Sequence, residues 1–539
     1  MKKIKEILFD RNYIFVLFFI FIIIYSFLIY KDFGISTDEG TEYTTLKVNA
    51  KKIYSRLGIL DKAPESVREA QDIKSYEDRY YGVAGQLPLI VLDYFPEICG
   101  SNTPAFWYIR HLYVRLIFIL AGFCFYLILK DLIKSKPLLL LSLILFFFHP
   151  RISAHSFYNI KDSLFLSFFT ISSYFLFKFI KNRKMEDLAI FSLLTALTIN
   201  IRAMGILLPL YFGFWILTNL KRNREESGKF VLVFIVLSVS FLYFIWPVIW
   251  EEHATAFLDI FKTFSKYPWK GSLIYNGKLI KGSDIPITYI PVWILLSSPL
   301  GYILVFVLGI ILTPIILIGL LKNRRFSYTF HVLLFSLYSV LASYGAVVFF
   351  HSTLYGDWRH LYYIYPSLLI MGIAGMDFIL KKNTKVLYLI VFFIFLSLIR
   401  TFLWMGKNHP HYYVYFSPIA GNDWDIKWDR DFWRPSTKQL LEKFIEKDDP
   451  TNANGKYLLL EDHDGKLNVR ILPPGVKEKF EFTGNYDDAQ YIIGNYRTII
   501  GDYPEDKYKG FEEYINIKVD GKKIMTLFKR VDGGSEKEF

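Results

Sequence analysis

The sequence predicts a mainly α-helical membrane protein with about eleven transmembrane helices, followed by a small α/β domain at the carboxyl end. Hydrophobic residues make up 53% of the 539 residues and aromatic residues 19%, which is too apolar for an ordinary soluble domain. The charged residues, 21% of the chain, gather between long apolar segments. After residue 404 the composition changes to Asp, Lys, Gly and Asn.

The predicted spans are segments rich in Phe, Ile and Leu, and the longest match the ~20 residues needed to cross a hydrocarbon core. The first is too long for the apolar core of a signal peptide and lacks a small-residue cleavage site, so we expect a retained anchor. The third and fifth are short for a crossing, which leaves two explanations: they lie inside the bundle, or their ends extend further. The expected spans are 12–30, 111–129, 137–149, 163–180, 188–201, 205–219, 230–250, 296–320, 331–350, 361–380 and 386–404.

The distribution of cations predicts the orientation of these spans. Clusters of Lys and Arg fall on one side when the sides are alternated, and by the positive-inside rule that side is cytoplasmic. The amino terminus is then cytoplasmic and the carboxyl terminus extracytoplasmic, and we expect the plasma (inner) membrane of a bacterium. The clusters are Lys2, Lys3, Lys5 and Arg11; Lys130, Lys134 and Lys136; Lys181, Arg183 and Lys184; Lys221, Arg222 and Arg224; Lys322, Arg324 and Arg325; and Lys381, Lys382 and Lys385.

This distribution also explains the net charge of +13 without a nucleic-acid partner. The only two cysteines, Cys99 and Cys124, predict neither a disulfide framework nor a metal cluster.

The predicted orientation leaves three long segments outside the cell: 31–107, 251–295 and 405–539. We expect residues 1–404 to form the transmembrane domain and 405–539 a separate extracytoplasmic α/β domain. Short β-type runs support this second domain, because turn signals such as Asp464-Gly465 and Asp520-Gly521 separate them. These runs are 456–460, 489–493, 514–519 and 523–528.

Candidate catalytic carboxylates follow the first span directly. Asp38 and Glu39 lie where two adjacent acids are costly unless they are solvated, paired or used in chemistry. In one interpretation Ser36 or Thr37 caps a helix whose positive end favours the acids. In the other, a carboxylate accepts the proton of an attacking hydroxyl as a general base.

Further along the same external segment, Glu77 and Arg79 are candidates for binding a phosphate group. The guanidinium fork of Arg79 suits phosphate oxygens, and Glu77 or Asp78 could orient a partner. A solvated charge cluster before a turn remains the alternative.

The polar segment His149 to Asp162 is costly in lipid and must line a polar cavity or the water interface. One explanation is an interfacial anchor with a helix cap at Asn159 or Asp162. The other is a site for a phosphate or a sugar. The candidates there are Arg151 and Lys161 for phosphate, and His155, Tyr158, Asn159 and Asp162 as substrate-lining residues.

Two more external patches carry candidate residues. Arg202 lies between two spans with almost no loop around it, so as a buried cation it needs an anionic partner, either an acid of the third-span loop or a ligand phosphate. Arg359 and His360 are further candidates for neutralising a phosphate. Trp358 could line a sugar or belong to the interfacial aromatic belt.

Together these residues resemble the GT-C superfamily of glycosyltransferases, in the branch that holds protein O-mannosyltransferases and bacterial aminoarabinose transferases (glycosyltransferase family 39 and relatives). The resemblance extends over nearly the whole chain and includes the order of spans and the soluble tail. The resemblance is based on Thr37-Asp38-Glu39-Gly40, the segment His149 to Asp162, Tyr267-Pro268-Trp269, Tyr289 to Trp293, Trp358 to Tyr362, and His409 to Phe416.

The resemblance implies a polyprenyl-phosphate-linked sugar donor, transfer on the extracytoplasmic face, inversion at the anomeric carbon, and Asp38 as the base with Glu39 beside it. Glu77 and Arg79 resemble later first-loop residues that contact the donor phosphate. Some members of this branch hold a divalent metal with a carboxylate and a His, and no spacing here compels one. The sugar and the acceptor, whether glycan, lipid or protein, stay open.

Two other functions compete with this prediction. A lipid or solute transporter would have the same apolar bulk, but transporters favour internal repeats and charges in mid-span, whereas these charges gather in external loops. A non-catalytic scaffold that presents residues 405–539 to a partner would not depend on Asp38, Lys161 or Arg202.

Overall fold

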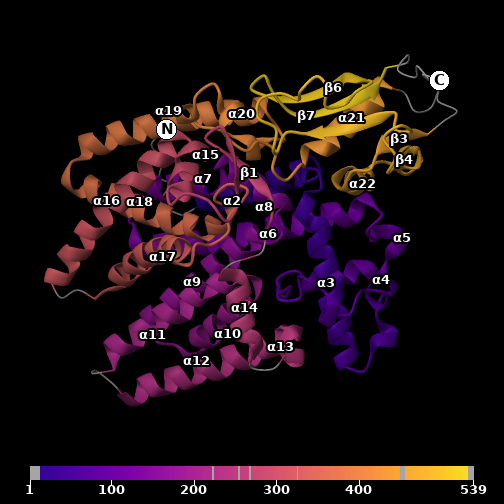
Figure 1. Cartoon of the computed structure of the whole chain (residues 1–539). Helices are drawn as coiled ribbons and strands as arrows, with labels where there is room; N and C mark the ends of the chain where they lie inside the picture. The colour runs from indigo at the N-terminus through magenta and orange to yellow at the C-terminus, as the bar shows by residue number, and fades with distance from the viewer. Residues whose placement is uncertain are drawn as a thin grey trace, which may run out of the picture.

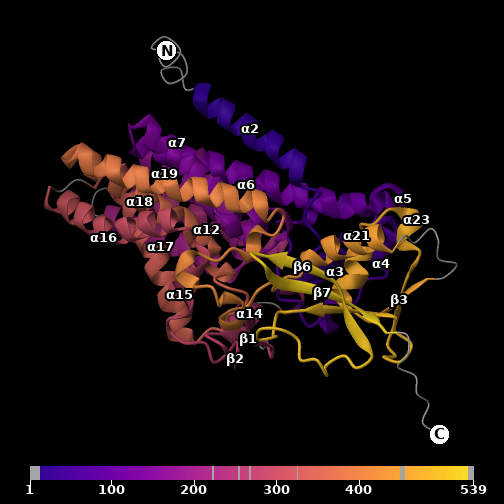
Figure 2. The ribbon, with the colours of Figure 1, turned by 90° about the horizontal axis from the view of Figure 1, so that it is seen from above.

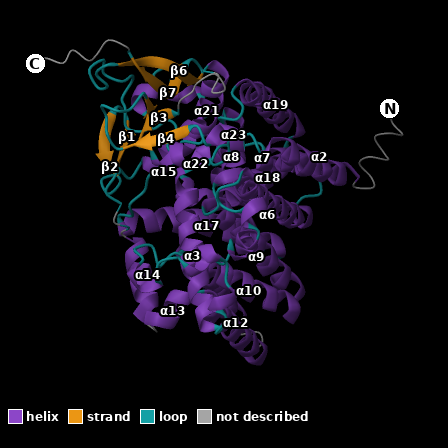
Figure 3. Cartoon of the chain, turned by 90° about the vertical axis from the view of Figure 1, so that its right-hand side faces the viewer, coloured by secondary structure: helices purple, strands orange, loops and turns teal. Residues whose placement is uncertain are grey.

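The computed structural model describes residues 13–220, 224–252, 255–265, 267, 269–323, 326–448 and 456–531. Most of these residues form helices, and the strands gather at one end of the helical body (Figures 1 and 3). Several predictions fall outside the described residues: the cations of the amino terminus, residue 12 of the first span, Lys221, Arg222, Arg324, Arg325 and Pro268.

Within these ranges, seven helical segments are long and apolar enough to cross a membrane. They are α6 (Pro104–Leu132), α9 (Asp162–Asn182), α12 (Arg224–Ile245), α16 (Leu300–Lys322), α17 (Tyr328–Phe350), η5 with α18 (Arg359–Lys382) and α19 (Thr384–Lys407). The molecule is therefore a helical protein with the features of a multi-pass membrane protein.

The other four predicted spans are shorter or broken helices. The first is α2 (Tyr13–Ile29), which lies alongside α6 at the edge of the helical body (Figure 2). The third is α7 (Lys136–Phe147), which bends by 58° into α8 (Pro150–Tyr158). The fifth and sixth are α10 (Met185–Ile201) and η4 with α11 (Ala203–Ile206 and Leu207–Asn219).

Prolines explain where the observed helices differ from the predicted spans. The predicted span 230–250 is broken, because Pro247 disfavours a helical conformation at Trp246 and starts α13 (Pro247–Glu252). Pro150 likewise starts α8 after the bend and turns the polar segment back into the protein. Pro104 starts α6 seven residues before the predicted 111, so Arg110 and His111 lie inside that helix.

The segment between α2 and α6 is folded and largely helical. Its long helix is α3 (Thr37–Arg56), which carries the candidate acids in its first turn. The rest consists of η1 (Leu60–Lys62), α4 (Glu65–Arg68), η2 (Ile73–Ser75), η3 (Leu87–Tyr94) and α5 (Pro96–Cys99).

The middle segment is shorter and joins α12 to α16. It contains α13, α14 (Thr255–Ser265), the antiparallel hairpin β1 (Ser272–Tyr275) and β2 (Lys278–Lys281), and α15 (Tyr289–Ser297). Tyr275 forms an isolated bridge with Trp428, so this hairpin contacts the carboxyl-terminal segment.

The carboxyl-terminal segment builds a five-stranded mixed sheet in the order β4-β3-β5-β7-β6. Its strands are β3 (Tyr457–Leu460), β4 (Phe480–Thr483), β5 (Tyr491–Asn495), β6 (Phe511–Val519) and β7 (Lys522–Arg530). Four of them match the predicted runs, and β4 was not predicted. Helices α20 (Trp424–Lys427), α21 (Ser436–Lys447), α22 (His463–Val469) and α23 (Pro474–Lys477), with the short turns η6 (Tyr412–Val414) and η7 (Pro418–Ala420), complete the segment.

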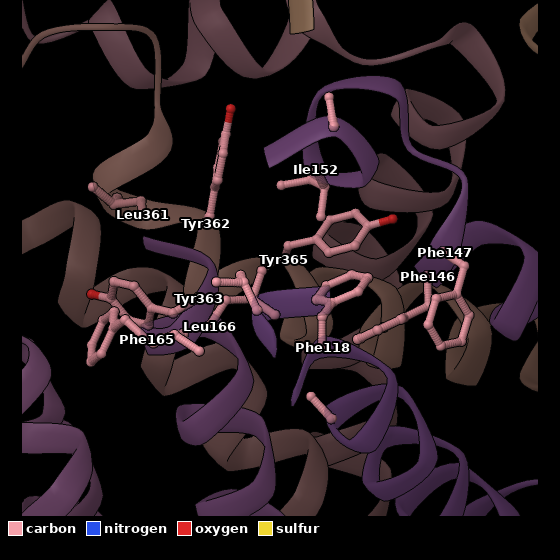
Figure 4. Packing of buried hydrophobic residues seen from close by; sticks show 14 of the residues in the cluster. Phe118, Phe146, Phe147, Ile152, Phe165, Leu166, Leu361, Tyr362, Tyr363 and Tyr365 are labelled. Carbon is pink, nitrogen blue, oxygen red and sulfur yellow. The ribbon is translucent and has the colours of Figure 1, made fainter. Parts of the chain in front are cut away.

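A buried aromatic core holds the polar elements in place. Phe118 of α6 stacks on Phe146 of α7, with ring centroids 4.9 Å apart, and Tyr363 packs against Phe165 of α9 at 4.7 Å (Figure 4). These contacts position α6, α8, α9 and η5 around one region at the end of the helical body, close to the first turn of α3.

Candidate active site

The carboxyl-terminal segment holds the start of α3, and with it Asp38. The backbone N–H and the hydroxyl of Thr37 donate to the carbonyl oxygen of Trp433 at 3.0 and 3.2 Å. Asn468 holds Ile35, two residues before Thr37, because its side-chain amide accepts from the Ile35 N–H at 2.9 Å and donates to the Ile35 carbonyl at 3.0 Å. These contacts explain why α3 begins at Thr37 although the Ser36 side chain forms no capping hydrogen bond.

Asp38 faces a small cavity of about 230 Å³, measured to its open mouth. The residues that line it are Ser36, Asp38, Glu39, Glu42, Tyr158, Asn159, Ile160, Lys161 and Trp433. The Asp38 side chain keeps 43% of its surface exposed, whereas the neighbouring acids Glu39 and Glu42 are buried. Asp38 is therefore the carboxylate of this cavity that an incoming group can reach.

The surroundings of Asp38 raise the pKa of its carboxyl group from 3.8 to about 6. Desolvation by the protein around the cavity is the largest cause, and the nearby negative charge of Glu42 adds to it. The Arg359 guanidinium, 3.7 Å from the carboxylate, opposes the rise. A carboxylate with a pKa in this range is ionised at neutral pH and still basic enough to accept a proton.

Asp162 joins two of the predicted cations on the wall of the same region. Its carboxylate accepts from Arg359 at 2.7 Å and pairs with Arg202, and all three side chains lie largely out of solvent. The N-cap position of α9 is Lys161, whose side chain forms no capping hydrogen bond, so the predicted cap at Asn159 or Asp162 is wrong. The Asn159 amide oxygen instead orders the turn before α9, because it accepts from the backbone N–H of Asp162 at 2.8 Å.

Lys161 belongs to a buried chain of charged and polar side chains. The sequence predicted Lys161 as a candidate, but not the other members, Glu42, Gln86 and Arg110. Its ammonium group pairs with Glu42 at 2.5 Å, Glu42 also accepts from Gln86 at 3.0 Å, and Gln86 accepts from Arg110 at 3.2 Å. Burial lowers the pKa of Lys161, and the Glu42 carboxylate counteracts this. Arg110 is fully buried, and its Nε and Nη1 have no partner among the described residues.

Glu39 has a different environment from Asp38 although the two are adjacent. Its side chain is 2% exposed, and both carboxylate oxygens lie 2.9 and 3.0 Å from His111 Nε2 of α6. This buried contact fixes the first turn of α3 against α6. Of the two adjacent acids, Glu39 is therefore a buried contact between helices, and Asp38 is the one that faces the cavity.

Arg151, His155 and Trp358 do not line the Asp38 cavity. Arg151 pairs with Asp357 at 3.0 Å and packs on the rings of Trp293 and Phe416. Trp358 is fully buried and donates to Ser297 at 2.9 Å, so it is an interior residue and does not belong to an interfacial belt. His155 accepts from the Asn159 amide at 3.0 Å. Arg151 and His155 line a second cavity, which shares Trp433 with the Asp38 cavity.

Arg79 and Glu77 lie outside this group. Arg79 donates to Glu252 of α13 at 2.8 Å, and Glu77 lines a separate cleft on the other face of α3. The predicted candidates that do come together are Asp38, Tyr158, Asn159, Lys161, Asp162, Arg202 and Arg359, with His360 next to Arg359 in η5.

Several buried donors around the cavity have no hydrogen-bond partner within the described ranges. They are the Tyr158 hydroxyl, Nε of Arg202, Nε of Arg359 and Nδ1 of His360. Buried donors normally find an acceptor, so this end of the molecule can accommodate an additional anion or hydroxyl-bearing group. In the part of the chain that the structure describes, no three His, Cys, Asp or Glu side chains are arranged to hold a metal ion.

Neither the models of known protein families nor the curated protein sequences contain a match to the chain.

Proposed function

We propose that the protein is an inverting membrane glycosyltransferase that moves a sugar from a polyprenyl-phosphate-linked donor to the hydroxyl of an acceptor on the extracytoplasmic face. The observation that carries this proposal is the pairing of Asp38, an accessible carboxylate with a raised pKa, with the Arg359 guanidinium 3.7 Å away. Such a pair offers a base for the acceptor and a cation for the leaving group.

In the proposed reaction, the acceptor oxygen attacks the anomeric carbon while the bond from that carbon to the phosphate oxygen breaks. Asp38 takes the proton of the acceptor hydroxyl, and the polyprenyl phosphate leaves with the bonding electron pair. Glycosyl transfer passes through an oxocarbenium-like state, so stabilising the departing phosphate lowers the barrier together with activating the nucleophile.

The buried cations support the second half of this mechanism. Arg202 and Arg359 share the carboxylate of Asp162, and Arg359 also lies 3.7 Å from Asp38, so the two cations are balanced while Asp38 is ionised. Lys161 is balanced by Glu42, and Arg110 lies at the end of the same chain of contacts with unpaired donors. Once Asp38 accepts a proton, one positive charge is left over, and the phosphate that departs beside Arg359 would balance it.

Replacing Asp38 tests the proposal. Asp38→Asn keeps the size of the side chain but removes the base, and loss of a positioned general base commonly slows a reaction by about 100- to 10,000-fold. The measurement is transfer of radiolabelled sugar from synthetic polyprenyl-phosphate sugars to membrane acceptors. Asp61→Asn, at an exposed acid of the same segment, is the matched control. Wild-type turnover in a correctly inserted Asp38→Asn protein would refute the assignment.

A further inference from the structure

A second and much larger cleft lies on the opposite face of α3. Its volume is about 1440 Å³, counted to its open mouth. Side chains of a helix that are three or four residues apart share a face, so Asp38 and Glu42 lie on the side of the small cavity, whereas Gly40, Thr44 and Lys47 line the cleft. The α22 end of the carboxyl-terminal segment forms the facing wall (Figure 1).

Two cations at one end of this cleft have no anionic partner. Lys47 lies 4.6 Å above the ring of Tyr43, and Arg470 follows α22 on the facing wall. In the described ranges, no carboxylate lies within 4.0 Å of Lys47 or Arg470, and neither side chain forms a hydrogen bond. Both side chains are half-buried. Burial lowers the pKa of each, and the Arg470 charge adds to the effect on Lys47.

The acids around Lys47 act on it only at longer range. Asp93 and Glu69 partly offset the charge of Lys47, but neither lies within 4.0 Å of its ammonium group, and the Asp93 carboxylate accepts hydrogen bonds from the hydroxyls of Tyr43 and Ser66. The acids that line the cleft, Glu77 and Asp78, belong to the loop on the other wall, where Asp78 accepts from Tyr267 at 3.0 Å. Two like charges that are partly desolvated and unpaired attract an anion strongly.

The rest of the lining suits a hydroxyl-rich ligand. Thr41, Thr44, Gln71, Ser75, Ser101 and Asn102 present side chains that can donate and accept hydrogen bonds. Gly40 lets α22 approach, because a Cβ at this position would lie 3.1 Å from Leu467. The cleft reaches to within one helical turn of Asp38.

We propose that this cleft binds a glycan chain that carries phosphate or carboxylate groups, with Lys47 and Arg470 holding the anionic group. The role of this chain as the sugar acceptor rests on the proposed function. The binding itself does not rest on the proposed function, since the residues involved lie on a face of α3 that Asp38 does not share.

The test measures binding to the full-length protein in detergent, without turnover. The probes are a fluorescently labelled, sulfated hexasaccharide and a neutral gluco-hexasaccharide of the same length. Lys47→Gln combined with Arg470→Gln should weaken binding of the sulfated probe at least tenfold. Lys509→Gln combined with Lys518→Gln removes the same charge from exposed positions outside the cleft and should change binding less than twofold.

A second variant separates shape from charge. Thr44→Trp fills the cleft and leaves every charge in place, so it should also weaken binding of the sulfated probe at least tenfold. Asp38→Asn should bind as the wild type does, even if it is inactive, which separates failure of the cleft from failure of the proposed function. The proposal would be overturned by an equal loss of binding in the Lys47/Arg470 and Lys509/Lys518 double variants. Equal affinity of the wild type for the sulfated and the neutral probe would also overturn it.

Discussion

Two adjacent acids at the start of α3 differ because of what surrounds each one. Asp38 faces an open cavity and lies 3.7 Å from Arg359, whereas Glu39 is enclosed and contacts His111 with both oxygens. A single step along the helix turns a side chain by about 100°, so neighbours in sequence face different elements. Residue type alone therefore makes both acids candidates for the general base, and only their surroundings distinguish them.

The raised pKa of Asp38 predicts a pH dependence. A general base must be ionised, so kcat/KM should rise with pH and reach half its maximum near pH 6, the pKa of Asp38 in the free enzyme. Below pH 5 the rate should fall about tenfold per pH unit, since only the ionised fraction is active. The measurement is the initial transfer rate at low acceptor concentration between pH 4.5 and 8. A rate independent of pH across this range would contradict the role of Asp38.

Asp162 should be the least replaceable acid of the site. Asp162→Asn leaves Arg202 and Arg359 buried around a neutral amide, and breaking a buried ion pair commonly costs about 3–5 kcal/mol. The matched control is Asp131→Asn, at an exposed pair with Lys181 at 2.9 Å, which should cost about 0–1 kcal/mol. Thermal unfolding of the two purified variants in the same detergent gives the comparison. Equal melting temperatures would show that Asp162 is not essential to this packing.

The sequence predicted part of this site and missed another part for identifiable reasons. Asp38, Lys161, Arg202 and Arg359 were predictable, because polar residues beside apolar spans need a wet or paired environment. Arg110 and His111 were missed because they lie at the edge of an apolar segment whose buried face cannot be read from composition. Trp433 was missed because nothing in its local sequence links it to α3, almost 400 residues earlier.

At the scale of elements, the close approach of α16 to α18 depends on small residues. Gly309 of α16 and Gly372 of α18 lie at the crossing: a Cβ on Gly372 would lie 2.4 Å from the carbonyl oxygen of Val305, and one on Gly309 would lie 2.6 Å from the backbone nitrogen of Gly372. Small residues allow such backbone contact between helices in a membrane. The same helix α18 continues from η5, which carries Arg359.

Enlarging Gly372 should therefore loosen the support of the site. Gly372→Ala puts a methyl group into the Val305 backbone, and overpacking of this kind costs about 1–3 kcal/mol. The control is Gly319→Ala in α16, where a Cβ meets nothing within 4 Å. Melting temperatures in detergent should fall for Gly372→Ala only. A similar fall in both variants would mean that the crossing is not the sensitive contact.

The ends of the elements were predicted less well than their presence. Each predicted span coincides with a helical segment, because long apolar runs are a strong signal. Seven of these segments meet the length and composition of a membrane crossing, and the count of eleven remains a prediction for the others. Strand β4 was not predicted, since the four residues Phe480–Thr483 are too few for their alternation of apolar and polar side chains to be distinctive.

At the scale of the whole molecule, the segment between α2 and α6 and the carboxyl-terminal segment are joined through several contacts. Asn468 clamps Ile35, Trp433 holds the start of α3, and the Lys438 ammonium donates to the Lys31 carbonyl at 2.6 Å. Trp433 also lines the Asp38 cavity. The predicted boundary at residue 404 thus separates segments that contribute to one site, and this could not be deduced from sequences more than 390 residues apart.

The predicted orientation in the membrane decides whether this joint site faces the outside. Lys62→Cys, Lys382→Cys and Lys509→Cys place single thiols at exposed positions, in a protein whose buried Cys99 and Cys124 are replaced by Ser. In sealed right-side-out vesicles, a membrane-impermeant maleimide should label positions 62 and 509 directly, and position 382 only after permeabilisation, because Lys382 belongs to a cation cluster predicted to be cytoplasmic. The reverse pattern would put Asp38 on the cytoplasmic side, where the proposed extracytoplasmic transfer could not take place.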